Sequence, residues 1–131
     1  MPKLRVLVVD DDDMVRTHLA SILSTAQHIV HSLPSAIGVT RAVVTHRIDV
    51  VAIDVSMPTL SGDKLAQLLR QNPRCKDLGV VLISGRPMEE LENIAREVAA
   101  DAVVTKDKAR TDLVRAVEYA AKLRGRRGEG A

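Results

Sequence analysis

Polar side chains directly follow four apolar runs of this sequence, and their types could together carry out phosphoryl chemistry. They are Asp10, Asp11, Asp54, Ser84 and Lys106. Three carboxylates that share one crevice raise each other's pKa values unless a cation neutralises them. Because the group contains oxygen ligands and neither cysteine nor histidine, it favours a hard cation. An incomplete ligand set that leaves positions open for water and phosphate suits Mg²⁺.

The same group could also hold a phosphoryl group. A lysine can pair first with a carboxylate and then with a phosphoryl oxygen, and a serine hydroxyl can donate to a second oxygen. An aspartate in this setting can attack phosphorus and form an aspartyl phosphate. Catalysis would then consist of positioning and charge neutralisation. Each residue alone has an ordinary explanation as a turn, strand-end or surface residue, so the hypothesis depends on their occurring together.

The elements that must position these residues follow from the hydrophobic pattern. Apolar runs predict strands over Leu4–Val9, His28–Leu33, Asp49–Ile53, Gly79–Ser84 and Asp101–Thr105, and helical spacing follows each run. Such alternation predicts an α/β fold with a parallel sheet, helices on both faces and right-handed crossovers. Functional residues of open parallel sheets gather at the carboxyl ends of the strands, where the polar residues lie.

Local signals set some of the helix boundaries. Asp12 or Asp13 is suited to cap the first helix, where acidic residues favour the helix dipole, so we assign both to the helix rather than to the cation. The second helix is expected to open at Pro34 and to contain Gly38, and Pro87 is expected to start the fourth.

Composition restricts the classes of function. The 131 residues fit one domain, and one tyrosine without phenylalanine or tryptophan predicts an aliphatic core and almost excludes stacking on nucleic-acid bases. A net charge of +2 does not favour a nucleic-acid or membrane surface. The single cysteine, Cys75, excludes an intrachain disulfide and is interpreted as a bystander. Without a signal-peptide pattern or a membrane-spanning apolar run, we expect a cytoplasmic protein.

Four segments resemble the receiver domain of bacterial two-component response regulators. They are VLVVDDDDMVR, DVVAIDVSMPTLSG, VVLISG and AADAVVTKD, and the resemblance extends over about residues 3–123. It implies a flavodoxin-like (βα)5 fold, doubly wound in three layers, with a five-stranded parallel sheet in the order 2-1-3-4-5. We expect the receiver domain to cover residues 1–124 and a flexible tail, or the start of a linker, to cover 125–131.

The resemblance also assigns roles around the cation. Asp54 is implied to be the phosphorylated nucleophile. Asp11 is implied to bind Mg²⁺ directly, together with Asp54 and the backbone carbonyl of Ser56, whereas Asp10 acts largely through water.

Ser84 and Lys106 are implied to hold phosphoryl oxygens. The donor would be a phosphohistidine on a sensor histidine kinase or a phosphotransfer protein. The signal would pass to a downstream protein partner or output domain, without direct contact to nucleic acid. The resemblance therefore implies a signalling protein, monomeric or weakly dimeric, that assists its own phosphorylation and dephosphorylation rather than an enzyme.

Three positions depart from the family pattern. Val103 replaces the tyrosine or phenylalanine that normally swings inward when the signal is read. Lys106–Asp107 replaces Lys-Pro, whose peptide is typically cis; here the bond is either trans with a different loop, or cis at a cost of about 2.5–4 kcal/mol. Gly85 leaves room at the edge of the phosphate, and Arg86 either reaches the phosphoryl group or is an exposed loop residue.

Two other functions compete with a phosphorylated receiver. A degenerate receiver that binds partners independently of phosphorylation is favoured by Val103 and Asp107, although the set of site residues is complete. A haloacid-dehalogenase-like phosphatase fits the D-x-D-x-[TV] pattern at Asp11–Val15. That hypothesis leaves the segment Asp54–Gly62 unexplained, and after the fourth strand the chain has no carboxylate before Glu89.

Overall fold

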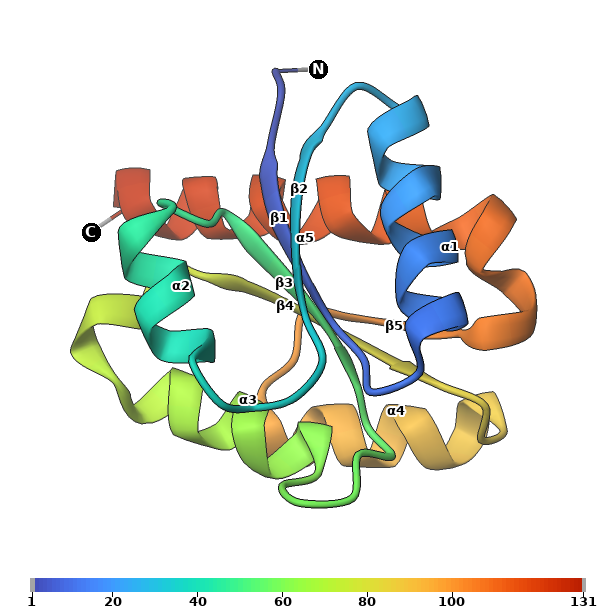
Figure 1. Ribbon diagram of the computed structural model, residues 1–131. Coiled ribbons are helices and arrows are strands. Elements are labelled where there is room, and N and C mark those ends of the chain that lie inside the picture. Colours follow the sequence, from blue (N-terminus) through green and yellow to red (C-terminus); the bar gives the residue numbers. More distant parts are fainter. Residues whose placement is uncertain (1, 131) are drawn as a thin grey trace.

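A computed structural model describes residues 2–130, with side chains described as far as residue 124. Five parallel strands form one sheet in the order β2-β1-β3-β4-β5 (Figure 1). The strands are β1 (Arg5–Val9), β2 (Ile29–Leu33), β3 (Val50–Asp54), β4 (Gly79–Ser84) and β5 (Ala102–Thr105). The predicted parallel sheet, its order and the flavodoxin-like fold are confirmed.

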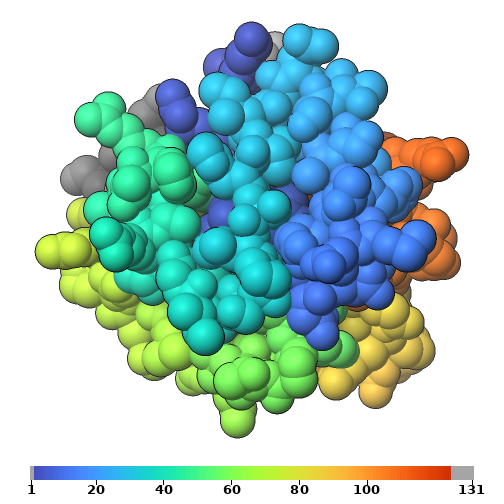
Figure 2. All heavy atoms as spheres, viewed as in Figure 1, coloured from blue at the N-terminus to red at the C-terminus, as the bar shows by residue number. Residues whose placement is uncertain are grey.

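Helices cover both faces of this sheet. They are α1 (Asp13–Thr25), α2 (Val39–Thr45), α3 (Gly62–Gln71), α4 (Met88–Val98) and α5 (Ala109–Gly130), with short 3₁₀ helices η1 (Pro73–Cys75) and η2 (Lys106–Lys108). Helices α1 and α5 pack on one face, and α2, α3 and α4 pack on the other (Figure 1). Figure 2 shows how the side chains of α1, β2 and α2 form the surface on one side of the molecule.

The alternation of side chains along the strands divides the core into two clusters. On β1, Val6 and Val8 pack toward α1 and α5, whereas Leu7 and Val9 pack toward the other three helices. All four are buried, as expected for a parallel sheet covered on both faces, where strands are apolar throughout. The core is aliphatic, as the composition predicts.

Two local predictions had different outcomes. Asp12 caps α1, because its side chain accepts hydrogen bonds from the backbone N–H groups of Met14 and Val15, as predicted. The predicted start of the second helix at Pro34 was wrong, since α2 begins only after Gly38. Gly38 has a φ of +83°, a left-handed conformation that glycine adopts easily and that cannot continue a right-handed helix toward the N-terminus.

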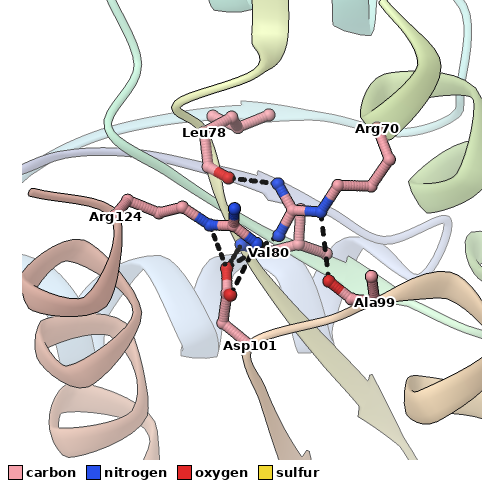
Figure 3. Close-up of polar contacts among 6 residues, drawn as sticks. All are labelled: Arg70, Leu78, Val80, Ala99, Asp101 and Arg124. Atoms are coloured by element: carbon pink, nitrogen blue, oxygen red, sulfur yellow. Dashed lines mark hydrogen bonds and ion pairs between the residues drawn. The ribbon is translucent and has the colours of Figure 1, made fainter. Parts of the chain in front are cut away.

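The amino edge of the sheet is held by a buried carboxylate, Asp101, directly before β5 (Figure 3). Its oxygens accept hydrogen bonds from the guanidinium groups of Arg70 on α3 and Arg124 on α5, and from the backbone N–H of Val80 on β4. Arg70 also donates to the carbonyl of Ala99 at 3.1 Å. The cluster therefore joins α3, β4, β5 and α5 at the edge opposite the strand ends that carry the polar residues.

The prediction of a flexible tail or linker at the C-terminus stays a prediction. Residues 125–131, predicted as a flexible tail or the start of a linker, lie outside the residues whose side chains the structure describes. Within the described part of the chain, no helix combines the length and the apolar character needed to cross a membrane.

Candidate functional site

The carboxyl ends of β1, β3 and β4 bring three of the predicted polar residues to one edge of the sheet. Asp10 follows β1 and is fully buried, Asp54 ends β3 with 2% exposure, and Ser84 ends β4 and is fully buried. The register pairs Asp54 with Ile83 and Ser84 with Thr105, the residue before Lys106. Topology alone thus gathers residues that are far apart in the sequence.

Three carboxylates form an acidic group at this edge. One oxygen each of Asp10, Asp11 and Asp54 lies within 4.8 Å of the others. Oδ2 of Asp10 is buried and, among the described residues, makes no hydrogen bond. Buried polar atoms usually have partners. The contact of this oxygen is an ion pair with Lys106 at 3.3 Å, which leaves the oxygen able to bind a further ligand. The oxygen-only donor set suits a hard divalent cation such as Mg²⁺.

Lys106 supplies the nearest positive charge to the two buried carboxylates. Its Nζ lies 3.3 Å from Oδ2 of Asp10 and 3.4 Å from Oδ2 of Asp54. Burial lowers the pKa of the Lys106 ammonium, but the attraction of Asp54 and Asp10 outweighs it, so the pKa is raised above its usual value. The lysine is therefore protonated at neutral pH and can pair with anions at this site.

Asp54 is in a less favourable position for ionisation. Burial, the largest effect, raises the pKa of its carboxyl, and the neighbouring charge of Asp10 raises it further. The backbone N–H of Ser56 and the ammonium of Lys106 lower this pKa without reversing the shift. A cation bound among these carboxylates would favour the ionised Asp54 that a nucleophile requires.

The loop after β3 fixes the orientation of Asp54. The backbone N–H of Ser56 donates to Oδ1 of Asp54 at 3.1 Å, and Oδ2 lies toward Lys106. Gly62, the first residue of α3, packs so closely that a Cβ at this position would collide with the backbone carbonyl of Asp54. This close approach explains why the segment DVVAIDVSMPTLSG has a glycine at its last position, Gly62.

The turn between β1 and α1 contains a residue that the sequence analysis did not identify. Nη1 of Arg16 donates to the backbone carbonyl of Asp10 at 2.8 Å, and Nη2 pairs with the carboxylate of Asp13. The i, i+3 spacing of Asp13 and Arg16 is a signal for the ion pair. No pattern in the sequence indicates the bond to the Asp10 carbonyl, because it depends on the path of the turn.

A groove of about 620 Å³ lies beside the site, lined by Gly85–Met88 and Thr105–Lys108. Among the described residues, apart from Gly85 and its chain neighbours, no atom lies within 4 Å of a Cβ built on Gly85, so this part of the groove is open. The backbone N–H of Arg86 donates to Oγ of Ser84 at 3.0 Å, and the Arg86 side chain is exposed. The described residues contain no cis peptide, so Lys106–Asp107 is trans and begins η2.

Comparisons with known proteins agree on one family. The family model "Response regulator receiver domain" matches residues 6–118. A protein-glutamate methylesterase/protein-glutamine glutaminase of Cereibacter sphaeroides is 31% identical over 119 residues, which cover 87% of this chain and 31% of that protein. The two-component response regulator PhoP of Pseudomonas aeruginosa is 28% identical over 79% of this chain and 45% of its own length.

A solved structure gives the same result. The signal receiver domain of the putative response regulator NarL from Mycobacterium tuberculosis is 27% identical and superposes with a TM-score of 0.80, covering 93% of this chain and 98% of that one. The present chain spans less than half the length of the two curated relatives named above, so the resemblance concerns one domain of each.

Proposed function

Because the chain belongs to the family of response regulator receiver domains, we propose that Asp54 accepts a phosphoryl group in a Mg²⁺-dependent reaction. One observation carries this proposal: the Lys106 ammonium lies within 3.4 Å of the carboxylates of both Asp10 and Asp54. The proposed nucleophile, Asp54, and the ammonium of Lys106, which can pair with the incoming phosphoryl group, therefore lie together in one partly buried crevice.

The transfer step forms one bond and breaks one. A carboxylate oxygen of Asp54 attacks phosphorus, and the bond between phosphorus and the donor's imidazole nitrogen breaks. The electron pair stays on that nitrogen, which takes up a proton. Lys106 then pairs with a phosphoryl oxygen, and the Ser84 hydroxyl donates to another.

Mg²⁺, when bound, supplies the charge neutralisation that lets a phosphoryl group approach three carboxylates. Asp11, Asp54 and the backbone carbonyl of Ser56 would hold it directly, and Asp10 would act largely through water. Oδ2 of Asp10 is buried and contacts Lys106 as an ion pair, without a hydrogen bond to the described residues. This position and the clustering of the carboxylates support this ligand set.

The partners follow from the chemistry of the donor. We assign the donor as a phosphohistidine on a sensor histidine kinase or a phosphotransfer protein, and the recipient of the signal as a downstream protein or an output domain. A cytoplasmic location, a receiver domain over residues 1–124 and a monomeric or weakly dimeric state are parts of the same proposal.

Two alternative functions fit these observations less well. A degenerate, phosphorylation-independent binding module fits Val103, which is half-buried against the core cluster beneath α2, α3 and α4 and has no ring to swing inward. The ion pairs of Lys106 favour working chemistry instead. The family match over residues 6–118 favours a receiver over a haloacid-dehalogenase-like phosphatase.

Intact-mass analysis after treatment with acetyl phosphate tests the proposal. The wild-type protein with Mg²⁺ is expected to gain one phosphoryl group, and the gain should disappear in EDTA and in Asp54→Asn. A wild-type protein that gains no mass and does not respond to beryllofluoride would support the binding module instead.

A further inference from the structure

Asp11 is the exposed member of the acidic group. Its carboxylate makes no hydrogen bond or ion pair with the residues that the structure describes, in contrast to Asp10 and Asp54. No neighbouring side chain therefore orients this carboxylate before a cation arrives. Its direction depends on the backbone that carries it.

Both peptide groups that flank Asp11 are fixed by hydrogen bonds. The N–H of the following peptide, which belongs to Asp12, donates to Oδ1 of Asp10 at 2.9 Å. The carbonyl of the preceding peptide, which belongs to Asp10, accepts from Nη1 of Arg16 at 2.8 Å. Because a peptide group is planar, holding one of its polar atoms restricts the whole plane. Asp11 thus lies between two restrained planes.

Arg16 is itself held in place. Its backbone N–H donates to the carbonyl of Asp12 at 2.9 Å, within the first turn of α1. The second nitrogen of its guanidinium pairs with Asp13, and only 18% of the side chain is exposed. The planar guanidinium can make both contacts at once, which a lysine ammonium at the same position would do less well.

We infer that Arg16 is a positioning residue for Asp11, a proposed Mg²⁺ ligand. The inference rests on the proposed function, because it concerns the same cation. Arg16 acts through the peptide between Asp10 and Asp11 and does not touch the metal. Partners that orient metal ligands in this indirect way typically change metal affinity by about 10–100-fold when they are removed.

Simple electrostatics predicts the opposite change in Mg²⁺ affinity when Arg16 is replaced. A guanidinium near three carboxylates repels a divalent cation, so removing its charge alone would tighten Mg²⁺ binding. Loss of positioning would weaken it. The direction of the change in Kd therefore separates the two roles.

The test is a calorimetric Mg²⁺ titration of the full chain. Arg16→Met is expected to weaken binding about tenfold or more. Arg16→Lys should recover part of the affinity, since an ammonium can still donate to the Asp10 carbonyl. Arg115→Met on α5 is the matched control, because Arg115 also pairs with an aspartate three residues earlier, Asp112, and should leave Kd unchanged.

Thermal melting in EDTA accompanies each titration, so that an effect on Kd is separated from an effect on folding. If Arg16→Met does not fold, Arg16→Lys and Arg16→Gln replace it, with affinities expected between the wild type and the Asp11→Asn variant. Equal or tighter Mg²⁺ binding by a folded variant that lacks the guanidinium overturns the positioning role.

The result also distinguishes this inference from the proposed function. If the wild type binds Mg²⁺ and Asp11→Asn does not, the cation site stands, and an unchanged Kd in Arg16→Met removes only the role of Arg16. If the wild type itself does not bind Mg²⁺, both the site and the positioning role are rejected.

Discussion

Asp101 and Arg124 form a bidentate ion pair at the amino edge of the sheet. Nη2 of Arg124 lies 2.7 Å from Oδ1 of Asp101, and Nε lies 3.0 Å from Oδ2. Only 2% of the Asp101 side chain and 8% of the Arg124 side chain are exposed. A buried pair of this kind is costly to break from one side, because the remaining charge stays buried without compensation.

Asp101→Ala is therefore expected to lower the free energy of unfolding by about 3–5 kcal/mol. Urea denaturation measures this change. The control is Arg115→Ala, which breaks the exposed ion pair with Asp112 and should change stability by less than about 0.5 kcal/mol. Similar small losses in both variants would show that the Asp101 pair contributes no more than a surface contact.

Gly62→Ala should destabilise the protein by about 1–3 kcal/mol or more, because the added methyl group collides with the Asp54 carbonyl and with the Ile53 side chain. Gly85→Ala is the comparison, since no described residue beyond the two chain neighbours lies within 4 Å of the added carbon. Melting temperatures of the two variants in EDTA provide the measurement. A Gly62→Ala protein as stable as Gly85→Ala would contradict the close approach of α3 to β3.

The charge of Asp54 is expected to reduce stability in the absence of metal. Burial raises the pKa of this carboxyl in the folded state, so the folded protein holds the proton more strongly than the unfolded chain. Stability is then lost as pH rises from the unfolded value of 3.8 through the raised pKa. In EDTA at pH 7, Asp54→Asn should melt at a higher temperature than the wild type.

The difference between Asp54→Asn and the wild type should shrink as pH falls, and it should be smallest below 3.8, where the unfolded chain also holds the proton on Asp54. Added Mg²⁺ should raise the melting temperature of the wild type more than that of the variant. A wild type more stable than Asp54→Asn in EDTA at neutral pH would mean that Lys106 compensates the carboxylate fully.

Ala99→Gly is expected to stabilise the protein. Ala99 follows α4 with a φ of +56°, a left-handed conformation that costs a residue with a Cβ about 1–2 kcal/mol. Relief of this strain exceeds the extra backbone entropy of glycine, leaving a gain of about 0.5–1 kcal/mol. Ala116→Gly, inside α5, should instead lose about 1 kcal/mol, and denaturation of the two variants compares them directly.

The sequence was sufficient to predict the sheet and the acidic site because both depend on strong local signals. Continuous apolar runs marked the buried strands, and Asp10, Asp54 and Lys106 directly follow strands or end them, so topology alone brings them together. The start of α2 was mispredicted because propensity does not reveal that Gly38 is left-handed.

Contacts that depend on the three-dimensional path could not be predicted in the same way. The bond from Arg16 to the Asp10 carbonyl follows from how the β1–α1 turn closes. The contact between Asp101 and Arg124 joins residues 23 positions apart, and nothing in the sequence around either residue indicates that they pair. The sequence shows the types of these residues, but which of them contact each other depends on how the chain packs.

The Asp101 cluster and the acidic group around Asp54 lie at opposite edges of the same sheet, with the aliphatic core between them. Substitutions at well-separated positions that share no partners usually have additive effects on stability. Substitutions in the loops around Asp54 are therefore expected to leave the stabilising effect of the Asp101 cluster unchanged. The stability supplied at one end of the strands and the chemistry of the site at the other end can therefore be altered separately.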